Sequence, residues 1–289
     1  MSARVAQLVE HNSYKVGVRW FESIHAHHGR LAQLVERLVY TEKVIGSSPI
    51  PSTKMKFQVI YQDKDLIVIN KPAGLIVFPE GNIKEETLID QLIQEFPELK
   101  NCGQAPRYGV VHRLDKDTSG VILIAKTDQA LNFFQKEFKN RAVRKTYAAL
   151  VSGVIKEDSG MIRGWMGRGK DGKKQVLKIG PFRKSGFRDS KTFWKVVKRF
   201  PGYTLVLTRP KTGRKHQIRV HLAWLGHPII GDKLYSFKNQ SMPEGLNRQF
   251  LHSHRLKIKG LNGEMHEFIA PLPEELKTVL NNLKTYENN

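Results

Sequence analysis

Residues 112–120 read His-Arg-Leu-Asp-Lys-Asp-Thr-Ser-Gly and run directly into Val-Ile-Leu-Ile-Ala at residues 121–125. The five apolar residues predict a buried β-strand. The polar residues before them predict a loop, in which hydroxyl groups and backbone donors fix the conformation. A side chain at the end of a strand is held in place without deep burial, so Asp115 is a candidate for a positioned carboxylate.

Taken alone, this loop has other interpretations. A simple Asx or Ser/Thr turn leading into a strand has the same composition and no function. Asp115 and Asp117 have the composition of a glycosidase carboxylate pair, although residues two apart in a loop have no assured facing geometry. The residues of the loop leave these alternatives open.

The stretches on either side predict an α+β fold with a mixed, mostly antiparallel central sheet flanked by helices and loops. Apolar, β-branched runs predict strands at 57–61, 66–70, 121–125, 147–151, 193–197 and 203–207. Helical spacing predicts helices at 87–96 with Thr87 as cap, after Asp128 as cap, at 216–225 and at 276–283. Residues 160–186 are rich in Gly, Lys and Arg and predict a mobile basic excursion over the surface.

The charge of the chain indicates its partner. The 289 residues contain 48 Lys and Arg against 27 Asp and Glu, a formal net charge of +21, which favours nucleic acid over a chain of merely solvated lysines. No apolar run approaches the ~20 residues of a membrane span, so no membrane partner is expected. The single cysteine, Cys102, excludes an internal disulfide and predicts a reducing, cytoplasmic location, with a buried rather than a catalytic thiol.

Residues 1–54 differ from the remainder. Ala-Gln-Leu-Val-Glu occurs at 6–10 and again at 32–36. The amino-acid sequence that begins with the second copy, residues 32–51, resembles a transfer-RNA gene translated in a wrong frame. We therefore expect a doubtful extension at 1–54, a natural start at Met55 and one catalytic domain at 55–289. The segment holds seven Lys and Arg and four Glu, so +18 of the net charge of +21 remains for residues 55–289.

Five segments, in order, resemble the RluA family of pseudouridine synthases. They are NKPAG at 70–74, HRLDKDTSG at 112–120, RKTYAALVSG at 144–153, TGRKHQIRVHL at 212–222 and GHPIIGD at 226–232. The resemblance spans residues 61–273 and implies the pseudouridine synthase fold and an isomerase that acts on RNA. Many relatives carry a small RNA-binding domain ahead of the catalytic one, and the chain resembles a member with the catalytic domain only.

The resemblance also implies roles for three residues. Asp115 is the essential catalytic carboxylate, acting at the sugar carbon or on a ribose proton. Arg219 is expected to pair with Asp115 and to lower its pKa by ~1–3 units, although the residue alone suggests a phosphate contact or a surface ion pair. Tyr147 stacks on uracil and accepts the proton of carbon 5, although a strand tyrosine is commonly core or rim.

RNA contacts follow from the same motifs. Arg113 fills the space that the flipped uridine leaves, or only contacts phosphate. Further RNA-contact candidates are His112, Lys71, Lys145, Arg214, Lys215, His216 and Ile218, with Lys170, Lys173 and Lys174 in the basic stretch.

No cofactor or metal is expected, because isomerisation of uridine oxidises nothing. His216 and His221 are five residues apart, not four, and His252 and His254 lie in a stretch that resembles a late structural strand of the family. We expect a monomer whose substrate is ribosomal RNA, transfer RNA or both. The alternatives are a noncatalytic RNA-binding or ribosome-assembly protein, and a glycosidase or other nucleoside-cleaving enzyme; isomerised uridine, unchanged RNA and free base distinguish the three.

Overall fold

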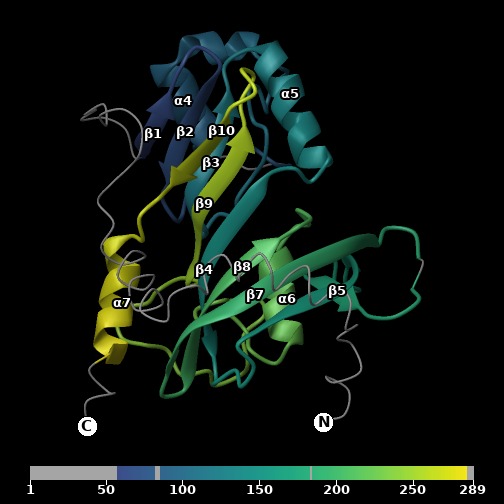
Figure 1. The fold of residues 1–289 in the computed structure, drawn as a ribbon, viewed down its shortest axis with the longest axis vertical. Coiled ribbons are helices and arrows are strands. Elements are labelled where there is room, and N and C mark those ends of the chain that lie inside the picture. The colour runs from purple at the N-terminus through teal and green to yellow at the C-terminus, as the bar shows by residue number, and fades with distance from the viewer. Residues whose placement is uncertain (1–56, 82–84, 183, 285–289) are drawn as a thin grey trace. The chain divides into compact units, whose positions relative to one another are not determined.

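The computed structural model of the protein describes residues 57–81, 85–182 and 184–284, and in these ranges the chain forms two compact units (Figure 1). The Asp115 unit comprises residues 57–147 and Leu251–Pro273, and the Arg219 unit comprises Ala148–Phe250 and residues 274–284. The expected extension at 1–54 and the start at Met55 lie outside the described residues. The single domain over 55–289 stays a prediction.

The Asp115 unit is built on a mixed sheet. Its strands are β1 (Gln58–Gln62), β2 (Leu66–Lys71), β3 (Ser119–Ala125), β9 (Leu251–Lys259) and β10 (Met265–Ile269), in the order β1-β2-β3-β9-β10. Only β3 and β9 pair in parallel; the other neighbours are antiparallel. This arrangement confirms the α+β prediction of a mixed, mostly antiparallel sheet.

Helices cover this sheet because their apolar faces match its alternating side chains. In α5 (Asp128–Lys139), Ala130, Leu131 and Phe134 are buried and share one core cluster with the alternate β3 residues 121, 123 and 125. The cap of α5 is Thr127, whose hydroxyl accepts from the N–H of Ala130, so the prediction of Asp128 as cap was one residue too late.

A second helix of this unit, α4 (Leu88–Glu95), begins after the predicted cap Thr87, and Asp90 completes a capping box. The one-turn helix η1 (Pro97–Asn101) follows it.

The Arg219 unit holds the antiparallel strands at the other end of the ten-stranded sheet. Its strands are β5 (Ser159–Arg168), β6 (Gln175–Lys178), β7 (Arg188–Phe200) and β8 (Tyr203–Pro210), in the order β8-β7-β5-β6. Its helices are α6 (Gln217–Trp224) and α7 (Glu274–Lys284). The strand β4 (Arg144–Ser152) begins in the Asp115 unit and ends in the Arg219 unit.

The prediction of a mobile basic excursion at 160–186 was wrong for residues 160–168 and 175–178, which belong to β5 and β6. The glycines in β5 permit close packing and do not break the strand. A Cβ on Gly164 would lie 2.6 Å from the carbonyl oxygen of Lys178 in β6, and a Cβ on Gly160 would lie 2.6 Å from the Trp194 ring in β7.

Candidate active site

The loop before β3 holds Asp115 half-buried in the Asp115 unit. Within the loop, the N–H of Thr118 donates to the carbonyl of Asp115 at 3.1 Å. From outside the loop, the N–H of Gly74 donates to the carbonyl of Lys116 at 2.9 Å. The backbone carbonyls of Asp115 and of the residue after it are therefore held by hydrogen bonds.

Lys71 is a second anchor of this loop. Its side chain is fully buried, and its ammonium donates to the carbonyls of Pro72 at 2.8 Å, Leu75 at 2.8 Å and Lys116 at 3.0 Å. Three carbonyl oxygens replace the water that a buried ammonium loses. Because the charge is enclosed and its contacts hold the segment next to Asp115, a structural role for Lys71 is favoured over RNA contact.

Tyr147 in β4 lies near Asp115. Its side chain is buried and shares a hydrogen bond with the hydroxyl of Ser253 in β9, which donates to the carbonyl of Val121 at 3.2 Å. Burial raises the pKa of Tyr147 to about 12, and the charge of Asp115 acts in the same direction. The phenol is therefore neutral at physiological pH and electrostatically coupled to Asp115.

The close approach of β3 to β9 fixes the end of the loop. Gly120 has φ +113°, and a Cβ there would lie 2.2 Å from the carbonyl oxygen of Ser253. Next to it, the Ser119 hydroxyl lies 2.9 Å from Nδ1 of His252, whose Nε2 lies 3.0 Å from the carbonyl oxygen of Ala270. These hydrogen bonds give His252 a structural role, as expected for a late structural strand.

The two basic residues that flank Asp115 are paired with glutamates. Arg113 forms an ion pair and hydrogen bond with Glu80, and its guanidinium lies 5.2 Å from the centre of the Phe78 ring. Lys116 pairs with Glu85 at 2.6 Å. Both basic side chains are exposed, so both can exchange a carboxylate for an RNA phosphate.

His112 makes structural contacts. Its Nε2 accepts the N–H of Leu123 at 3.0 Å, and its ring stacks on Phe138 with the centroids 4.6 Å apart. Burial lowers the pKa of His112 to about 3, with a further contribution from the nearby charge of Lys145. These contacts favour a packing role for His112 over RNA contact. Lys145, half-buried with its ammonium 5.7 Å from the Phe138 ring centre, stays a candidate for RNA contact.

Arg219 lies in α6 and is buried in the Arg219 unit. Its Nε and Nη2 donate to the two carboxylate oxygens of Asp232 at 2.7 and 2.8 Å. Burial alone raises the pKa of Asp232, but Arg219 and the N–H groups of Leu234 and Tyr235 hold it below its usual value. Arg219 thus belongs to a buried ion pair and not to a surface one; its expected pairing with Asp115 stays a prediction.

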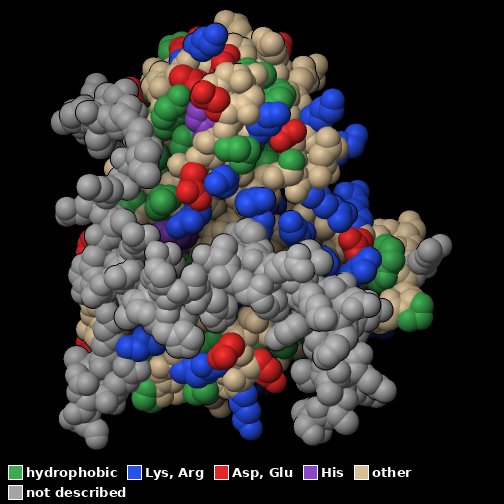
Figure 2. All heavy atoms as spheres, viewed as in Figure 1, with side chains coloured by type: hydrophobic (Ala, Val, Ile, Leu, Met, Phe, Trp, Pro, Cys, Tyr) green, Lys and Arg blue, Asp and Glu red, His purple; other side chains and the backbone are tan. Residues whose placement is uncertain are grey.

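The segment before α6 holds the remaining candidates. Arg214 donates from Nε to the carbonyl of Asp189 at 3.0 Å, Lys215 is exposed, and Nδ1 of His216 lies 2.9 Å from the Tyr235 hydroxyl. Ile218 is only 6% exposed, which favours packing in the core over RNA contact. In Figure 2, Lys and Arg side chains gather near the beginning of β7 as Figure 1 draws it.

Within the described residues, no group of three or more His, Cys, Asp or Glu is placed to hold a metal ion. His221 is fully buried, with Nε2 3.0 Å from the Ser190 hydroxyl. None of the helices in the described ranges is long and apolar enough to cross a membrane.

Sequence reasoning missed Ser253, Glu80 and Asp232 as partners of the candidate residues. Asp232 stands at the end of the matched segment 226–232, so its motif contained a signal. Ser253 and Glu80 gave none, because their pairings depend on which strands and loops become neighbours.

Comparison with known proteins identifies the family. The sequence profile described as RNA pseudouridylate synthase matches residues 65–224. An uncharacterised RNA pseudouridine synthase of Synechocystis sp. is 36% identical over 246 residues, covering 85% of this chain and 74% of the relative. Ribosomal large subunit pseudouridine synthase D of Haemophilus influenzae is 32% identical over 260 residues, covering 86% and 78%.

Solved structures agree. Human RNA pseudouridylate synthase domain containing 1 superposes with a TM-score of 0.62 at 29% identity, covering 78% of this chain and 86% of that one. Human RNA pseudouridylate synthase domain containing 4 superposes with a TM-score of 0.61 at 28% identity, covering 78% of this chain and 92% of that one. The chain belongs to the RNA pseudouridine synthase family and is an isomerase that acts on RNA, which confirms the resemblance drawn from the five segments.

Proposed function

We propose that this enzyme converts specific uridines of structured RNA to pseudouridine with Asp115 as the catalytic carboxylate and without a cofactor. The observation that carries the proposal is the position of Asp115: it lies half-buried at the start of β3, in a loop anchored by Lys71 and coupled to the buried phenol of Tyr147. A carboxylate held in this way suits a reaction that needs one charged atom at a fixed place.

The chemistry requires no redox step. The bond from ribose C1′ to N1 of uracil breaks, the base turns, and C1′ joins C5, which loses its proton while N1 gains one. Asp115 acts either as a nucleophile on C1′ or as a base that removes the ribose C2′ proton to give a glycal. Deuterium at C2′ distinguishes these routes, because only proton removal gives a primary isotope effect.

Tyr147, Arg219 and Arg113 complete the proposed site. A phenol with a pKa of about 12 is protonated at neutral pH, so Tyr147 can take the C5 proton only while it passes its own proton on to a base. Arg219 joins the proposed site through its position in the matched segment 212–222. Arg113 leaves Glu80 and enters the space vacated by the flipped uridine, at a cost of a few kcal/mol for unstacking.

The test compares two carboxylates of one loop. Asp115→Asn should abolish isomerisation under single-turnover conditions and leave RNA affinity within about threefold, because the shape and hydrogen bonding of the side chain are largely kept. Asp117→Asn is the matched control, since Asp117 is also half-buried in this loop, and it should retain activity within about tenfold. Equal activity of both variants would contradict the proposal.

For the substrate we favour ribosomal RNA, because a relative 32% identical to this chain carries the name ribosomal large subunit pseudouridine synthase D. Pseudouridine mapping of the host's RNA with and without the gene should show a site lost from ribosomal RNA. Loss from transfer RNA alone would overturn this choice and leave the role of Asp115 intact.

A further inference from the structure

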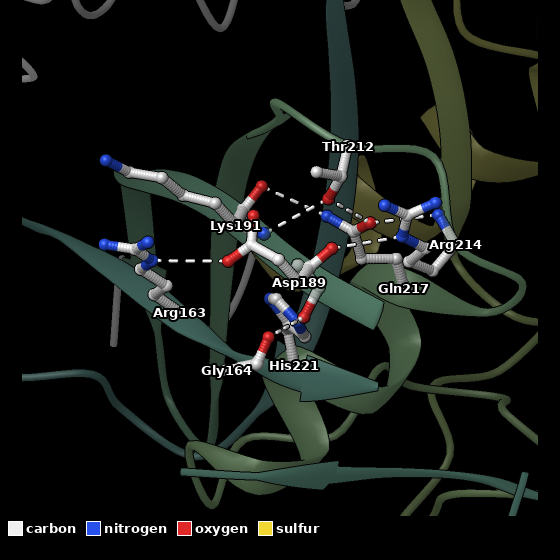
Figure 3. Close-up of polar contacts among 9 residues, drawn as sticks. Arg163, Gly164, Asp189, Lys191, Thr212, Arg214, Gln217 and His221 are labelled. Atoms are coloured by element: carbon white, nitrogen blue, oxygen red, sulfur yellow. Dashed lines mark hydrogen bonds and ion pairs between the residues drawn. The ribbon is translucent and has the colours of Figure 1, made fainter. Parts of the chain in front are cut away.

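Two positive side chains face each other across β5 and β7. Arg163 and Lys191 are direct partners in the antiparallel register. Like charges directly opposite each other destabilise a strand pair, so their juxtaposition needs a physical reason. Figure 3 shows that both side chains leave the strands toward the same side. The Arg163 side chain is 62% exposed, so the pair is open to a ligand from solvent.

The charge of this pair is only partly compensated. Nε of Arg163 lies 3.3 Å from a carboxylate oxygen of Asp189, which precedes Lys191 by two residues in β7. The ammonium of Lys191 lies 4.9 Å from the centre of the Phe193 ring. Burial lowers the pKa of Lys191 and the charge of Arg163 lowers it further, whereas Asp189 acts in the opposite direction. Two cations and one carboxylate leave these three residues with a net positive charge.

The backbone beneath the pair is held by hydrogen bonds (Figure 3). The N–H of Lys191 donates to the Thr212 hydroxyl at 3.1 Å, and Nε2 of Gln217 donates to the carbonyl of Lys191 at 3.1 Å and to the Thr192 hydroxyl at 2.9 Å. The Thr212 hydroxyl donates to Oε1 of Gln217 at 2.6 Å. The two cations therefore project from a backbone that hydrogen bonds already hold in place, so little backbone entropy is lost when they bind a ligand.

Gln217 links this hydrogen-bonded backbone of β7 to the proposed catalytic residue Arg219. It is the first residue of α6, and Arg219 follows two positions later in the same helix. The strand that carries Lys191 and the helix that carries Arg219 are thus joined through one buried side chain.

We infer that Arg163 and Lys191 together bind one phosphodiester group of the RNA substrate. The phosphate replaces Asp189 on the Arg163 guanidinium and accepts hydrogen bonds from both cations. A singly charged group with several acceptor oxygens matches a guanidinium fork and an ammonium that face the same side. The inference deepens the proposed function by naming part of its RNA-binding surface, and it rests on RNA as the substrate, not on the role of Asp115.

The number of phosphates held by the pair is measurable from the salt dependence of RNA binding. The probe is a fluorescently labelled stem–loop of ribosomal RNA, titrated by anisotropy at roughly 50 to 200 mM salt. The double variant Arg163→Met/Lys191→Met should bind about tenfold more weakly and lose about one unit of the slope of log K against log salt concentration, because both cations share one phosphate. Two independent phosphate contacts would remove about two units and would overturn the shared site.

Lys198→Met is the matched control. Lys198 also lies in β7, with its ammonium 5.2 Å from the Phe200 ring centre, but its register partner is Leu205 and not a cation. Its substitution should leave the slope unchanged; a loss equal to that of the double variant would mean a diffuse charge effect and contradict the site.

Asp189→Asn provides a test of opposite sign. Removal of the competing carboxylate should strengthen binding several-fold, which loss of structure cannot imitate. Weaker binding by Asp189→Asn at an unchanged melting temperature would contradict the inference. The role of Asp115 is judged separately, because the readout here is affinity and not isomerisation.

Discussion

The loop of Asp115 and the strand pair of Arg163 and Lys191 are both polar, but they are held in different ways. Hydrogen bonds fix the loop: the buried Lys71 ammonium and the N–H of Gly74 both donate to the carbonyl of Lys116. The strand pair is fixed only beneath its side chains, which stay accessible to solvent. The difference matches two tasks, since bond breaking needs one atom in one place and RNA binding needs charge at a surface.

The largest expected effect separates a buried ion pair from an exposed one. Asp232→Ala leaves the Arg219 guanidinium buried without that carboxylate and should lower the free energy of unfolding by about 3–5 kcal/mol. Glu267→Ala, which breaks the exposed pair with Arg255 at 3.3 Å, should cost only about 0–1 kcal/mol. Urea unfolding of both variants measures the difference. Equal losses of unfolding free energy would show that the buried Arg219–Asp232 pair stabilises the fold no more than the exposed pair does.

A somewhat smaller effect is expected at Lys71. Lys71→Met removes the donor to three carbonyls and should cost about 2–3 kcal/mol of stability. It should also reduce turnover at saturating RNA more than it reduces RNA affinity, because the loop of Asp115 loses its anchor. If Lys71 acted on phosphate, affinity and the salt slope would fall instead, with turnover at saturating RNA preserved.

Acid should weaken both units through buried histidines. Burial lowers the pKa of His112, His221 and His254 to about 3. Because these values lie below the unfolded pKa of about 6.5, the stabilisation is complete above pH 6.5 and is lost as the pH falls towards 3. Between pH 7 and 6 a loss of about 1–2 kcal/mol is expected in urea unfolding. Stability that is constant from pH 7 to 5 would contradict burial of the neutral rings.

The smallest effect concerns the glutamate that holds Arg113. Glu80→Gln removes a charge that competes with RNA phosphate, and should increase the association rate and the affinity about two- to fivefold at low salt. Glu98→Gln is the control, because Glu98 pairs with Lys126 at 3.9 Å in the same unit. Stopped-flow association with labelled RNA measures both, and an equal gain would point to net charge and not to the release of Arg113.

The sequence predicted the strands, the helices and the loop of Asp115 wherever periodicity and motif agreed. It failed for β5 because glycines usually interrupt strands, whereas Gly164 here allows the carbonyl of Lys178 to approach. It did not indicate the burial of Lys71, because a lysine normally stays in water, and only the folded loop supplies the three carbonyls that enclose its charge.

The site was predictable as far as its motifs reached. Asp115 and Tyr147 were predicted from two matched segments. In the structure, the charge of Asp115 adds to burial in raising the pKa of Tyr147. Their partners depend on pairings over long sequence distances: Ser253 meets Gly120 only because β9 lies parallel to β3. Such contacts have no local signal in one sequence.

The most direct test of the account measures single-turnover isomerisation and RNA affinity for Asp115→Asn beside Arg163→Met/Lys191→Met. The first variant should bind RNA within about threefold of the unmodified enzyme and form no pseudouridine, because only the reacting carboxylate is lost. The second should bind about tenfold more weakly and isomerise at a near-normal rate once RNA saturates it. Pseudouridine formed by Asp115→Asn at the unmodified rate would contradict the central claim.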